Sequence, residues 1–362
     1  MAESSTKDIL ESRIIAEAMI DLGAKCQVDA KKLGNAHILV TGGTGFFGSW
    51  VLVSFVALRK LGLPIEMTVL SRDPAKFLAN NPSFANVPGL VFRKGDVMDS
   101  TIPFSITHIL HFATAGAKSL YGESDQEVRS KVVDGTRHLL AEAKRVGAAR
   151  LLLASSGAVY GRSPKGDEAA GYSNLTPEDA LHADARLSAF GAAKREAEAL
   201  CRQAATSRDL ETVIVRGFTF GGPLFPVEGP YAISTFMSAI LNDRPLQVKS
   251  PDAVRSFLDG RDLAVVLWRL LASGRTGEAY NVGSDESVSM TELADLVRAV
   301  AWKVSLRVPE IRLMTPTYSG STRPTDIYRP CIDKLAREFG WRPTISLRQT
   351  LRDQAEWALA RR

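Results

Sequence analysis

Short apolar runs alternate with amphipathic stretches over the first two thirds of the chain. Helical or irregular segments, such as Phe46–Leu61 and Val128–Val146, separate these runs. Strands are predicted at five of them: His37–Val40, Met67–Leu70, Leu90–Phe92, His108–Phe112 and Arg150–Ala154. Alternation of buried strands with helices is typical of a parallel sheet covered by helices on both faces. The pattern therefore predicts an α/β fold with a doubly wound parallel sheet.

Both ends of the chain depart from this alternation. Residues 1–35 carry apolar side chains at helical spacing, among them Ile14, Ile15 and Ala18, which predicts a helical extension. We expect it to cap the protein's own core, with a dimer contact as the alternative. Glycines and prolines interrupt the pattern from residue 216, so we place the sheet domain at 36–215 and a smaller, interleaved α/β lobe at 216–362. Within that lobe, Ser289 and Glu292 have the spacing of a helix capping box.

Composition narrows the class of protein. The 362 residues include 45 Lys and Arg against 40 Asp and Glu, scattered along the chain, which argues against a nucleic-acid partner. Cys26, Cys201 and Cys331 form no close pair and no metal-binding spacing, so we predict neither disulfides nor a metal site. The N-terminus has no apolar block typical of a signal peptide or membrane span. We therefore expect a cytoplasmic protein that does not bind membranes.

A glycine-rich turn follows the first predicted strand. Gly42, Gly45 and Gly48 recur at three-residue spacing between that strand and the next helix. Glycine lets the backbone turn tightly and approach a pyrophosphate, whose charge is stabilised by the amides at the helix N-terminus. This context predicts a dinucleotide-binding site.

The end of the second strand bears on which dinucleotide binds. An acidic residue there holds a ribose 2′-hydroxyl, whereas an arginine accommodates a 2′-phosphate. Ser71 and Arg72 stand at this place and favour NADP, while Asp73 leaves NAD as the alternative. Asp96 and Val97, after the third strand, are expected to contact the adenine.

Further motifs follow along the chain: Ser155–Gly161, Arg216 with Gly222 and Pro223, Arg255–Phe257, Asp262–Ala264, Tyr280–Gly283, Arg323–Asp326 and Gly340–Pro343. Their order and spacing over residues 36–360 resemble the extended short-chain dehydrogenase/reductase family, in its sugar-nucleotide epimerase/dehydratase branch. The resemblance implies a Rossmann-type dinucleotide-binding domain and a nucleotide-diphosphate sugar as substrate. It also implies a homodimer formed through two long helices, here Ser130–Val146 and Phe190–Ala205.

The resemblance also implies roles for single residues. Ser156 would hydrogen-bond the reacting sugar oxygen, a tyrosine would exchange its proton, and Lys194 would hold the cofactor ribose and lower the pKa of that tyrosine. Arginines would clamp the substrate diphosphate, because the guanidinium fork matches phosphate oxygens. The implied cofactor contacts are Gly42, Gly45, Phe46, Phe47, Gly48, Ser71, Arg72, Asp96, Val97, Ala113 and Lys194. The implied substrate contacts are Thr114, Ser156, Thr219, Arg255 and Arg323.

Position 190 departs from the family pattern. Tyr-x-x-x-Lys would place a tyrosine four residues before Lys194, and this chain has Phe190. Three interpretations remain open. The chain is an engineered Tyr-to-Phe variant, or it is a dinucleotide and sugar-nucleotide binding protein without catalysis. Otherwise it is an enzyme in which another group moves the proton, such as Tyr160, Tyr172, His182 or a water held by Ser156.

The two residues after Ser156 bear on the reaction. Dehydratases and decarboxylases of the family usually carry acidic residues there, whereas this chain has Gly157 and Ala158. Chemistry that needs only a hydride and one proton is therefore favoured. We predict a nucleotide-sugar epimerase that works through a transient keto sugar by hydride exchange with bound NAD(P). An NADPH-dependent nucleotide keto-sugar reductase is the alternative.

Overall fold

The computed structural model describes residues 8–113, 123–161, 187–207, 209–314 and 327–362. These residues form two compact units, and each is described by itself. The first unit draws on Met1–Val159, Leu187–Gly217 and Leu263–Tyr280; the second draws on Tyr160–Arg186, Phe218–Asp262 and Asn281–Arg362. Within the described ranges, no helix has the length and apolar character needed to cross a membrane.

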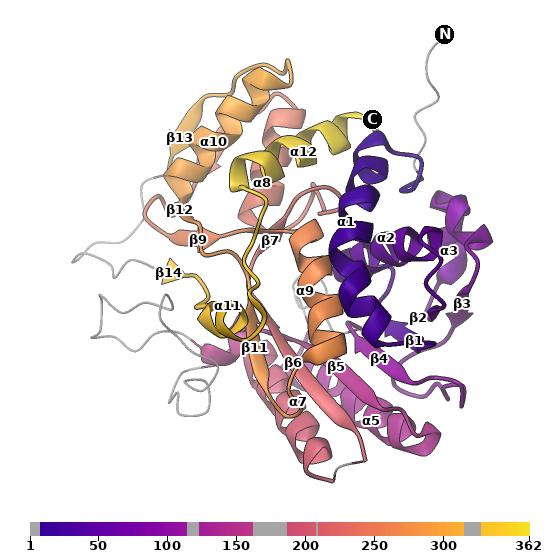
Figure 1. The fold of residues 1–362 in the computed structure, drawn as a ribbon. Helices are drawn as coiled ribbons and strands as arrows, with labels where there is room; N and C mark the ends of the chain where they lie inside the picture. Colours follow the sequence, from indigo (N-terminus) through magenta and orange to yellow (C-terminus); the bar gives the residue numbers. More distant parts are fainter. Residues whose placement is uncertain (1–7, 114–122, 162–186, 208, 315–326) are drawn as a thin grey trace. The chain divides into compact units, whose positions relative to one another are not determined.

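A seven-stranded parallel sheet forms the centre of the first unit (Figure 1). Across the sheet, the strands are β11 (Ala279–Val282), β6 (Glu211–Gly217), β5 (Arg150–Ser156), β4 (His108–His111), β1 (His37–Thr41), β2 (Glu66–Ser71) and β3 (Leu90–Lys94). Their core positions are apolar and rich in β-branched residues, as expected for strands buried on both faces. The five predicted strands are all present, and the predicted doubly wound α/β fold is confirmed.

Helices cover both faces of this sheet. Alternate strand residues such as Leu39, Leu151 and Leu153 pack with apolar residues of α5 and α7 in one core cluster. The helical segments of the first unit are α1 (Arg13–Lys32), α2 (Phe46–Lys60), α3 (Pro74–Asn80), η1 (Pro82–Asn86), α4 (Asp125–Arg129), the π-helical turn η2 (Ser130–Asp134), α5 (Gly135–Val146), α7 (Ala189–Thr206) and most of α9 (Gly260–Ser273). The helical stretch predicted at Val128–Val146 is therefore divided by a π-helical turn.

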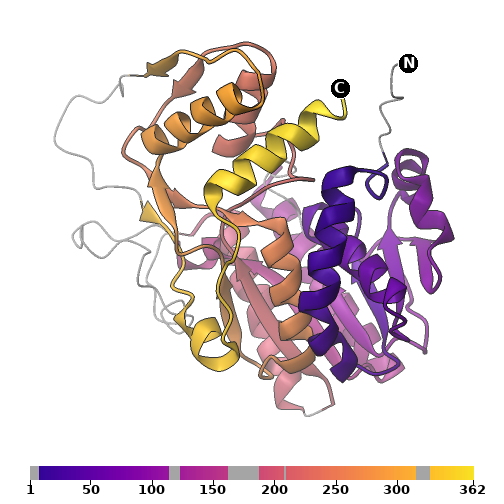
Figure 2. The ribbon, with the colours of Figure 1, turned by 45° about the horizontal axis from the view of Figure 1, so that its top comes forward.

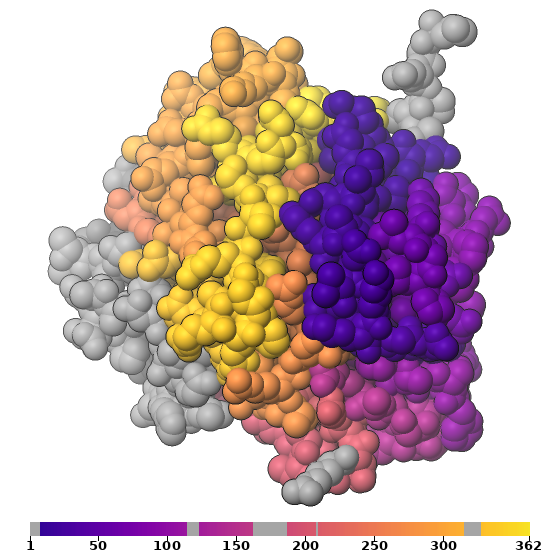
Figure 3. All heavy atoms as spheres, in the orientation of Figure 1, coloured from indigo at the N-terminus to yellow at the C-terminus, as the bar shows by residue number. Residues whose placement is uncertain are grey.

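The N-terminal helix α1 lies beside α2 and α9 (Figures 1 and 2). Its inner face buries Ile15, Leu22 and Cys26. Asp29, at the end of the buried face, accepts a hydrogen bond from Arg269 Nε of α9 at 2.9 Å. The outer face of α1 lies at the surface (Figure 3). The side chain of Ile20 is 79% exposed. A dimer contact through α1 stays a prediction.

The described part of the second unit contains short strands and four α-helices, three of which pack on one another. The capping box predicted at the start of α10 is present, because Ser289 Oγ accepts from the Glu292 amide and Glu292 Oε2 accepts from the Ser289 amide. Helices α8, α10 and α12 pack on one another, and Figure 2 shows α10 and α12 side by side. The elements are η3 (Gly157–Tyr160, at the boundary of the units), β7 (Phe220–Gly221), α8 (Ala232–Leu241), β8 (Leu246–Val248), β9 (Val254–Ser256), β10 (Leu258–Asp259), β12 (Ser287–Ser289), α10 (Met290–Lys303), β13 (Ile311–Leu313), β14 (Ile327–Tyr328), α11 (Asp333–Phe339) and α12 (Leu347–Leu359).

Candidate dinucleotide-binding and catalytic site

The glycine turn joins β1 to α2 where the strand order reverses. β1 lies between β2 and β4, and such a reversal leaves a crevice at the carboxyl ends of the strands. Gly42 has φ = 69°, and a Cβ on it would lie 2.7 Å from the amide nitrogen of Ala113, just beyond β4. A Cβ on Gly48 would lie 2.3 Å from the Cα of Gly43. Neither position therefore has room for a Cβ, and only glycine allows these backbone segments to approach so closely.

The start of α2 faces this turn. Gly45 is the N-cap residue and offers no side-chain oxygen to cap the helix. A helix N-terminus can bind an anion through its backbone amides. Phe46 and Phe47 form the first turn, and the ring of Phe47 meets that of Phe112 edge-on at 5.7 Å between centroids. The helix dipole favours negative charge at this end. The arrangement can hold a pyrophosphate.

A buried histidine supports the end of β4. Thr136 Oγ1 donates to the Val132 carbonyl, so His111 Nε2–H donates to Thr136 Oγ1 at 3.2 Å. His111 Nδ1 then accepts from Thr41 Oγ1–H at 2.7 Å, and Thr41 Oγ1 in turn accepts from the Ala113 amide. Burial, assisted by the Lys194 charge, lowers the pKa of His111 to about 3. A neutral imidazole therefore holds the backbone that faces the glycine turn.

The end of β2 carries the groups that would distinguish NADP from NAD. Ser71 Oγ accepts from the Asp73 amide, and Asp73 Oδ1 accepts from the Lys76 amide as the cap of α3. Arg72 is exposed. Lys94 of β3 is the register partner of Ser71 and is also exposed, so it adds a second cation at this edge of the sheet.

The turn after β3 places the two residues expected at the adenine. Asp96 Oδ1 accepts from the Met98 amide at 3.0 Å and shapes the turn. Val97 packs against the core cluster, and a Cβ on Gly135 would lie 3.1 Å from its Cγ1. The side chain of Val97 thus packs inward, while the carboxylate of Asp96 is half-buried at the strand end.

Ser156 ends β5. Its Oγ accepts from the Ala158 amide at 3.1 Å, which leaves its own hydrogen to donate to a substrate oxygen. Gly157 and Ala158 begin η3 directly after it and carry no acidic or hydroxyl group. Ser156 can therefore orient a sugar oxygen, and its two neighbours cannot exchange a proton.

The first turns of α7 bring Phe190 and Lys194 to one face of the helix. Lys194 Nζ lies 5.5 Å from the centroid of the Phe190 ring and donates to the Ala154 carbonyl of β5 at 2.6 Å. Lys194 is 2% exposed. Burial lowers its pKa to about 7, and the charge of Glu198 partly opposes this effect. A phenyl ring cannot exchange a proton, so Lys194 is the titratable group of this pair.

The second unit holds two of the residues expected at the substrate. Thr219 Oγ1 donates to the Ser256 carbonyl. Arg255 on β9 donates to the Val254 carbonyl at 2.8 Å, and its guanidinium lies 5.8 Å from the ring centroid of Tyr328. Thr114 and Arg323, as well as Tyr172 and His182, lie outside the described residues.

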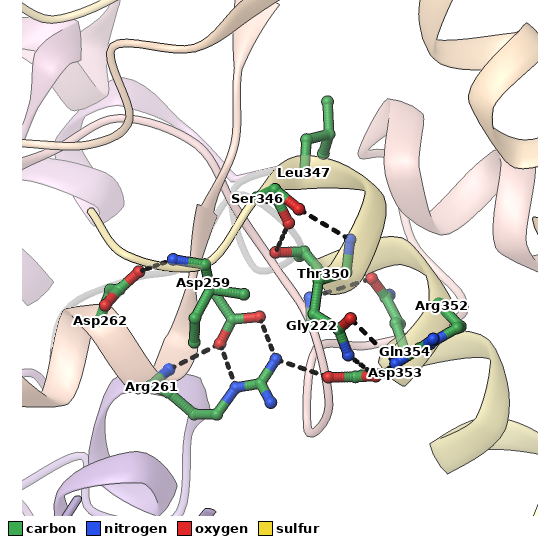
Figure 4. A network of polar contacts seen from close by, with 12 residues as sticks. Gly222, Asp259, Arg261, Asp262, Ser346, Leu347, Thr350, Arg352, Asp353 and Gln354 are labelled. Atoms are coloured by element: carbon green, nitrogen blue, oxygen red, sulfur yellow. Dashed lines mark hydrogen bonds and ion pairs between the residues drawn. The ribbon is translucent and has the colours of Figure 1, made fainter. Parts of the chain in front are cut away.

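A polar network supports the loop after Thr219 (Figure 4). The Gly222 amide donates to Gln354 Oε1, and Gly222 has φ = 99° with no room for a Cβ beside Asp259. Arg261 donates to both carboxylate oxygens of Asp259 at 2.8 Å and pairs with Asp353. Elsewhere in this unit, the hydroxyl of Tyr160 donates to Asn281 at 2.8 Å. Because Tyr160 is buried and its hydroxyl is hydrogen-bonded to Asn281, it is a poor candidate for the replacement proton carrier.

The sequence-based prediction assigned no individual role to several residues around the site, although Ser155 and Arg216 belong to its motifs. They are Thr41, Lys94, His111, Ser155, Glu198 and Arg216. A charged residue inside an apolar strand, as at Arg216, and an acidic residue one turn beyond Lys194 on a buried helix face are the signals that could have pointed to them.

Comparisons with known protein sequences agree with the fold. UDP-glucuronic acid decarboxylase 6 of Arabidopsis thaliana is 28% identical over 322 residues, 88% of this chain and 87% of that protein. dTDP-D-glucose 4,6-dehydratase of Homo sapiens is 25% identical over 331 residues, 89% of each. This chain is similar to both over most of their length.

Solved structures show the same architecture. UDP-N-acetylglucosamine 4-epimerase from Methanobrevibacter ruminantium, in complex with UDP-N-acetylmuramic acid, aligns with a TM-score of 0.73 and 20% identity over 91% of this chain and 100% of that one. The second structure is a Tyr-to-Phe mutant of UDP-glucuronic acid 4-epimerase from Bacillus cereus, in complex with UDP-4-deoxy-4-fluoro-glucuronic acid and NAD. It aligns with a TM-score of 0.71 and 19% identity over 89% of this chain and 98% of that one. At these identities the likeness shows the fold alone.

The family itself follows from the sequence match. The family model described as "NAD dependent epimerase/dehydratase family" matches residues 38–283, which is more than half of the chain. The resemblance predicted from the motifs is thereby confirmed, and the chain belongs to the NAD dependent epimerase/dehydratase family.

Proposed function

We propose that this protein binds a nicotinamide dinucleotide and a nucleotide-diphosphate sugar, and that a hydride passes between them. The observation that carries the proposal lies in the first unit, where the glycine turn, Ser156 and Lys194 are built on the carboxyl-end side of one parallel sheet. Gly42 and Gly48 allow a turn packed more closely than a Cβ would permit, and a glycine turn of this kind before a helix suits a pyrophosphate bound by the backbone. Lys194 would hold the nicotinamide ribose.

Within this class we propose epimerisation through a transient keto sugar. When bound, the nicotinamide accepts a hydride from a carbinol carbon and returns it. Ser156 would orient the reacting oxygen, whose proton must leave as the hydride leaves. Gly157 and Ala158 argue against elimination or decarboxylation, since neither can carry a proton or a charge. The relatives named above include a decarboxylase, a dehydratase and epimerases, so this assignment rests on the residues of this chain.

The cations at the ends of β2 and β3 support a second candidate, an NADPH-dependent keto-sugar reductase. Arg72 and Lys94 offer two positive charges where a 2′-phosphate would lie, and Asp73 is engaged as a helix cap. We expect NADPH to bind about tenfold more tightly than NADH, and Lys94→Gln to weaken NADPH without changing NADH. Fluorescence titration of both nucleotides measures this. NADH binding that equals or exceeds NADPH binding would overturn the preference.

Position 190 decides how the proton moves. We expect Phe190→Tyr to raise turnover on the true nucleotide sugar at least about a hundredfold, because a phenol beside Lys194 restores the acid/base group. Phe190→Leu is the matched control, since it changes the side chain without adding a hydroxyl. An unchanged rate in Phe190→Tyr would show that position 190 is not the proton site.

The screen would use UDP-glucuronic acid, dTDP-glucose and UDP-N-acetylglucosamine, with mass spectrometry of co-purified nucleotides to guide the choice. The Bacillus cereus Tyr-to-Phe mutant holds both a sugar nucleotide and NAD, which supports ligand binding by a fold that lacks a tyrosine hydroxyl. Dinucleotide binding without any turnover, even in Phe190→Tyr, would indicate the third candidate, a binding protein. A homodimer remains a prediction, which light scattering would test.

A further inference from the structure

A buried ion cluster in the first unit has no part in the chemistry proposed above. Glu198 of α7 is fully buried, and three side chains donate to its carboxylate. Ser155 Oγ donates to Oε1 at 2.6 Å, and Arg202 Nη2 donates to Oε2 at 3.1 Å. Arg216 of β6, also fully buried, donates through Nε and Nη2 at 2.8 and 2.6 Å. Burial raises the pKa of Glu198, but the bonds from Arg216 and Ser155 outweigh it and hold that pKa below its usual value.

The cluster joins the strand that carries Ser156 to its neighbours. Ser155 and Arg216 are register partners in the β5–β6 pair, so Glu198 binds the ends of both strands at once. Successive side chains of a strand alternate between faces. A fixed Ser155 therefore also fixes the rotation of Ser156, the next residue.

The same helix face leads from the cluster to the reacting centre. Glu198 lies one turn after Lys194, which itself lies one turn after Phe190. Lys194 donates to the Ala154 carbonyl, and Arg195 Nη2 donates to the Val159 carbonyl at 2.6 Å. The backbone at Gly191 also lies close to the turn after β5, since a Cβ there would be 2.4 Å from the Ala158 carbonyl oxygen. Helix and strand are thus tied at several successive points.

We propose that Ser155, Glu198 and Arg216 form a positioning cluster for the reacting centre. The cluster ties the strand that carries Ser156 to the helix that carries Phe190 and Lys194. Glu198 also places a carboxylate one helical turn from the Lys194 ammonium. A role of this cluster in catalysis rests on the proposed function, whereas its effect on the pKa of Lys194 does not.

The charges that face Lys194 come from three elements. Glu198 on α7 raises the pKa of Lys194, against the larger effect of burial. Arg202 on α7 and Arg216 on β6 are held by the same carboxylate. His111 on β4 is neutral near pH 7, because its pKa is about 3. Cys201 on α7 is an uncharged thiol, because burial raises its pKa to about 12. Glu198 is therefore the negative charge of this group.

The direct test measures the protonation of Lys194 by NMR on protein labelled with ¹³C-lysine, with Lys194→Arg to assign the signal. We expect Glu198→Gln to lower the titration midpoint of Lys194 by about one pH unit, since it removes a buried charge one turn away. Glu142→Gln is the matched control. Glu142 is also a buried carboxylate of this unit that pairs with an arginine, Arg145, but on α5. We expect this control to lose stability and to leave the midpoint of Lys194 unchanged.

The second measurement is the pH dependence of NADH and NADPH binding to the same proteins. If Lys194 holds the ribose, Glu198→Gln moves the midpoint of binding to lower pH by the same amount. An unchanged Lys194 midpoint in folded Glu198→Gln protein, or an equal shift in the Glu142→Gln control, would overturn the inference. Failure of every form to bind either nucleotide would overturn the proposed function, and the NMR midpoint would still decide the role of Glu198.

A double variant keeps the inference falsifiable if Glu198→Gln does not fold. Glu198→Gln with Arg216→Met removes both buried charges, so neither is left buried without its partner. We expect amide hydrogen exchange at Ser156–Ala158 and in the first turn of α7 to accelerate at least about tenfold, while exchange in β1 and β2 is unchanged. Unchanged protection at these amides would refute the tie between strand and helix.

Discussion

Replacing Gly42 by alanine adds a methyl group where the glycine turn meets the residues after β4. Gly42 has φ = 69°, and an alanine in this left-handed region costs about 1 kcal/mol. The new Cβ would lie 2.7 Å from the Ala113 nitrogen and 2.8 Å from the Phe112 carbonyl carbon. Both neighbours are backbone atoms, so the end of β4 must shift, and overpacking of this kind costs about 1–3 kcal/mol. We expect Gly42→Ala to lower the free energy of unfolding by about 2–4 kcal/mol in total.

Gly147→Ala is the control that separates these two costs. Gly147 has φ = 72°, and a Cβ on it would meet no described heavy atom within 4 Å. We expect this control to lose about 1 kcal/mol, the conformational part alone. Urea unfolding followed by far-UV circular dichroism measures both variants, provided that the slopes with denaturant agree.

Ligand binding provides a second readout of the same change. The clash would displace the backbone of the turn that we propose binds the pyrophosphate, so we expect NADPH affinity to fall at least about tenfold in Gly42→Ala. Gly147→Ala should bind as the unaltered protein does. The reasoning is refuted if Gly42→Ala is no less stable than Gly147→Ala and also retains its affinity.

Three further predictions follow from buried groups. Because the pKa of His111 is about 3 when folded and 6.5 when unfolded, its contribution to stability is complete above pH 6.5 and is lost as the pH falls from there towards 3. NMR should show a neutral ring with Nε2 protonated down to about pH 5, and a midpoint near 6.5 would contradict this. Asp29→Asn should lower the free energy of unfolding by about 1–3 kcal/mol in a urea titration, because α1 loses a charged bond to α9; an unchanged midpoint would refute this. Native protein should expose only one reactive thiol to a disulfide reagent, that of Cys331, since Cys26 and Cys201 are buried with raised pKa values; rapid reaction of either buried thiol would refute the packing.

Much of the fold could be predicted from local sequence patterns. The strands around the glycine turn were predictable because continuous apolar runs of this length, broken by glycine, have few other structures to adopt. The capping box at Ser289 was predictable because its two bonds join residues three positions apart. The division of the helix after Val128 was not, since the π-helical turn at Ser130–Asp134 has no composition that marks it.

The candidate site also has a part that the sequence predicts and a part that it does not. Ser156, Phe190 and Lys194 could be named from motif spacing, and so could the glycines of the turn. The contact of Gly42 with the backbone after β4 could not, because the two segments are separated by about 70 residues and meet only through the β1–β4 pairing.

The sequence by itself determined the family, the parallel sheet and the presence of a phenylalanine at the acid/base position. Tertiary structure alone decided which charges surround that position. Glu198 and Arg216 meet because α7 packs on the β5–β6 pair in one register, and Ser155 joins them for the same reason. Residue types specify what a side chain can bind, whereas the register of strands and helices specifies which partner it reaches.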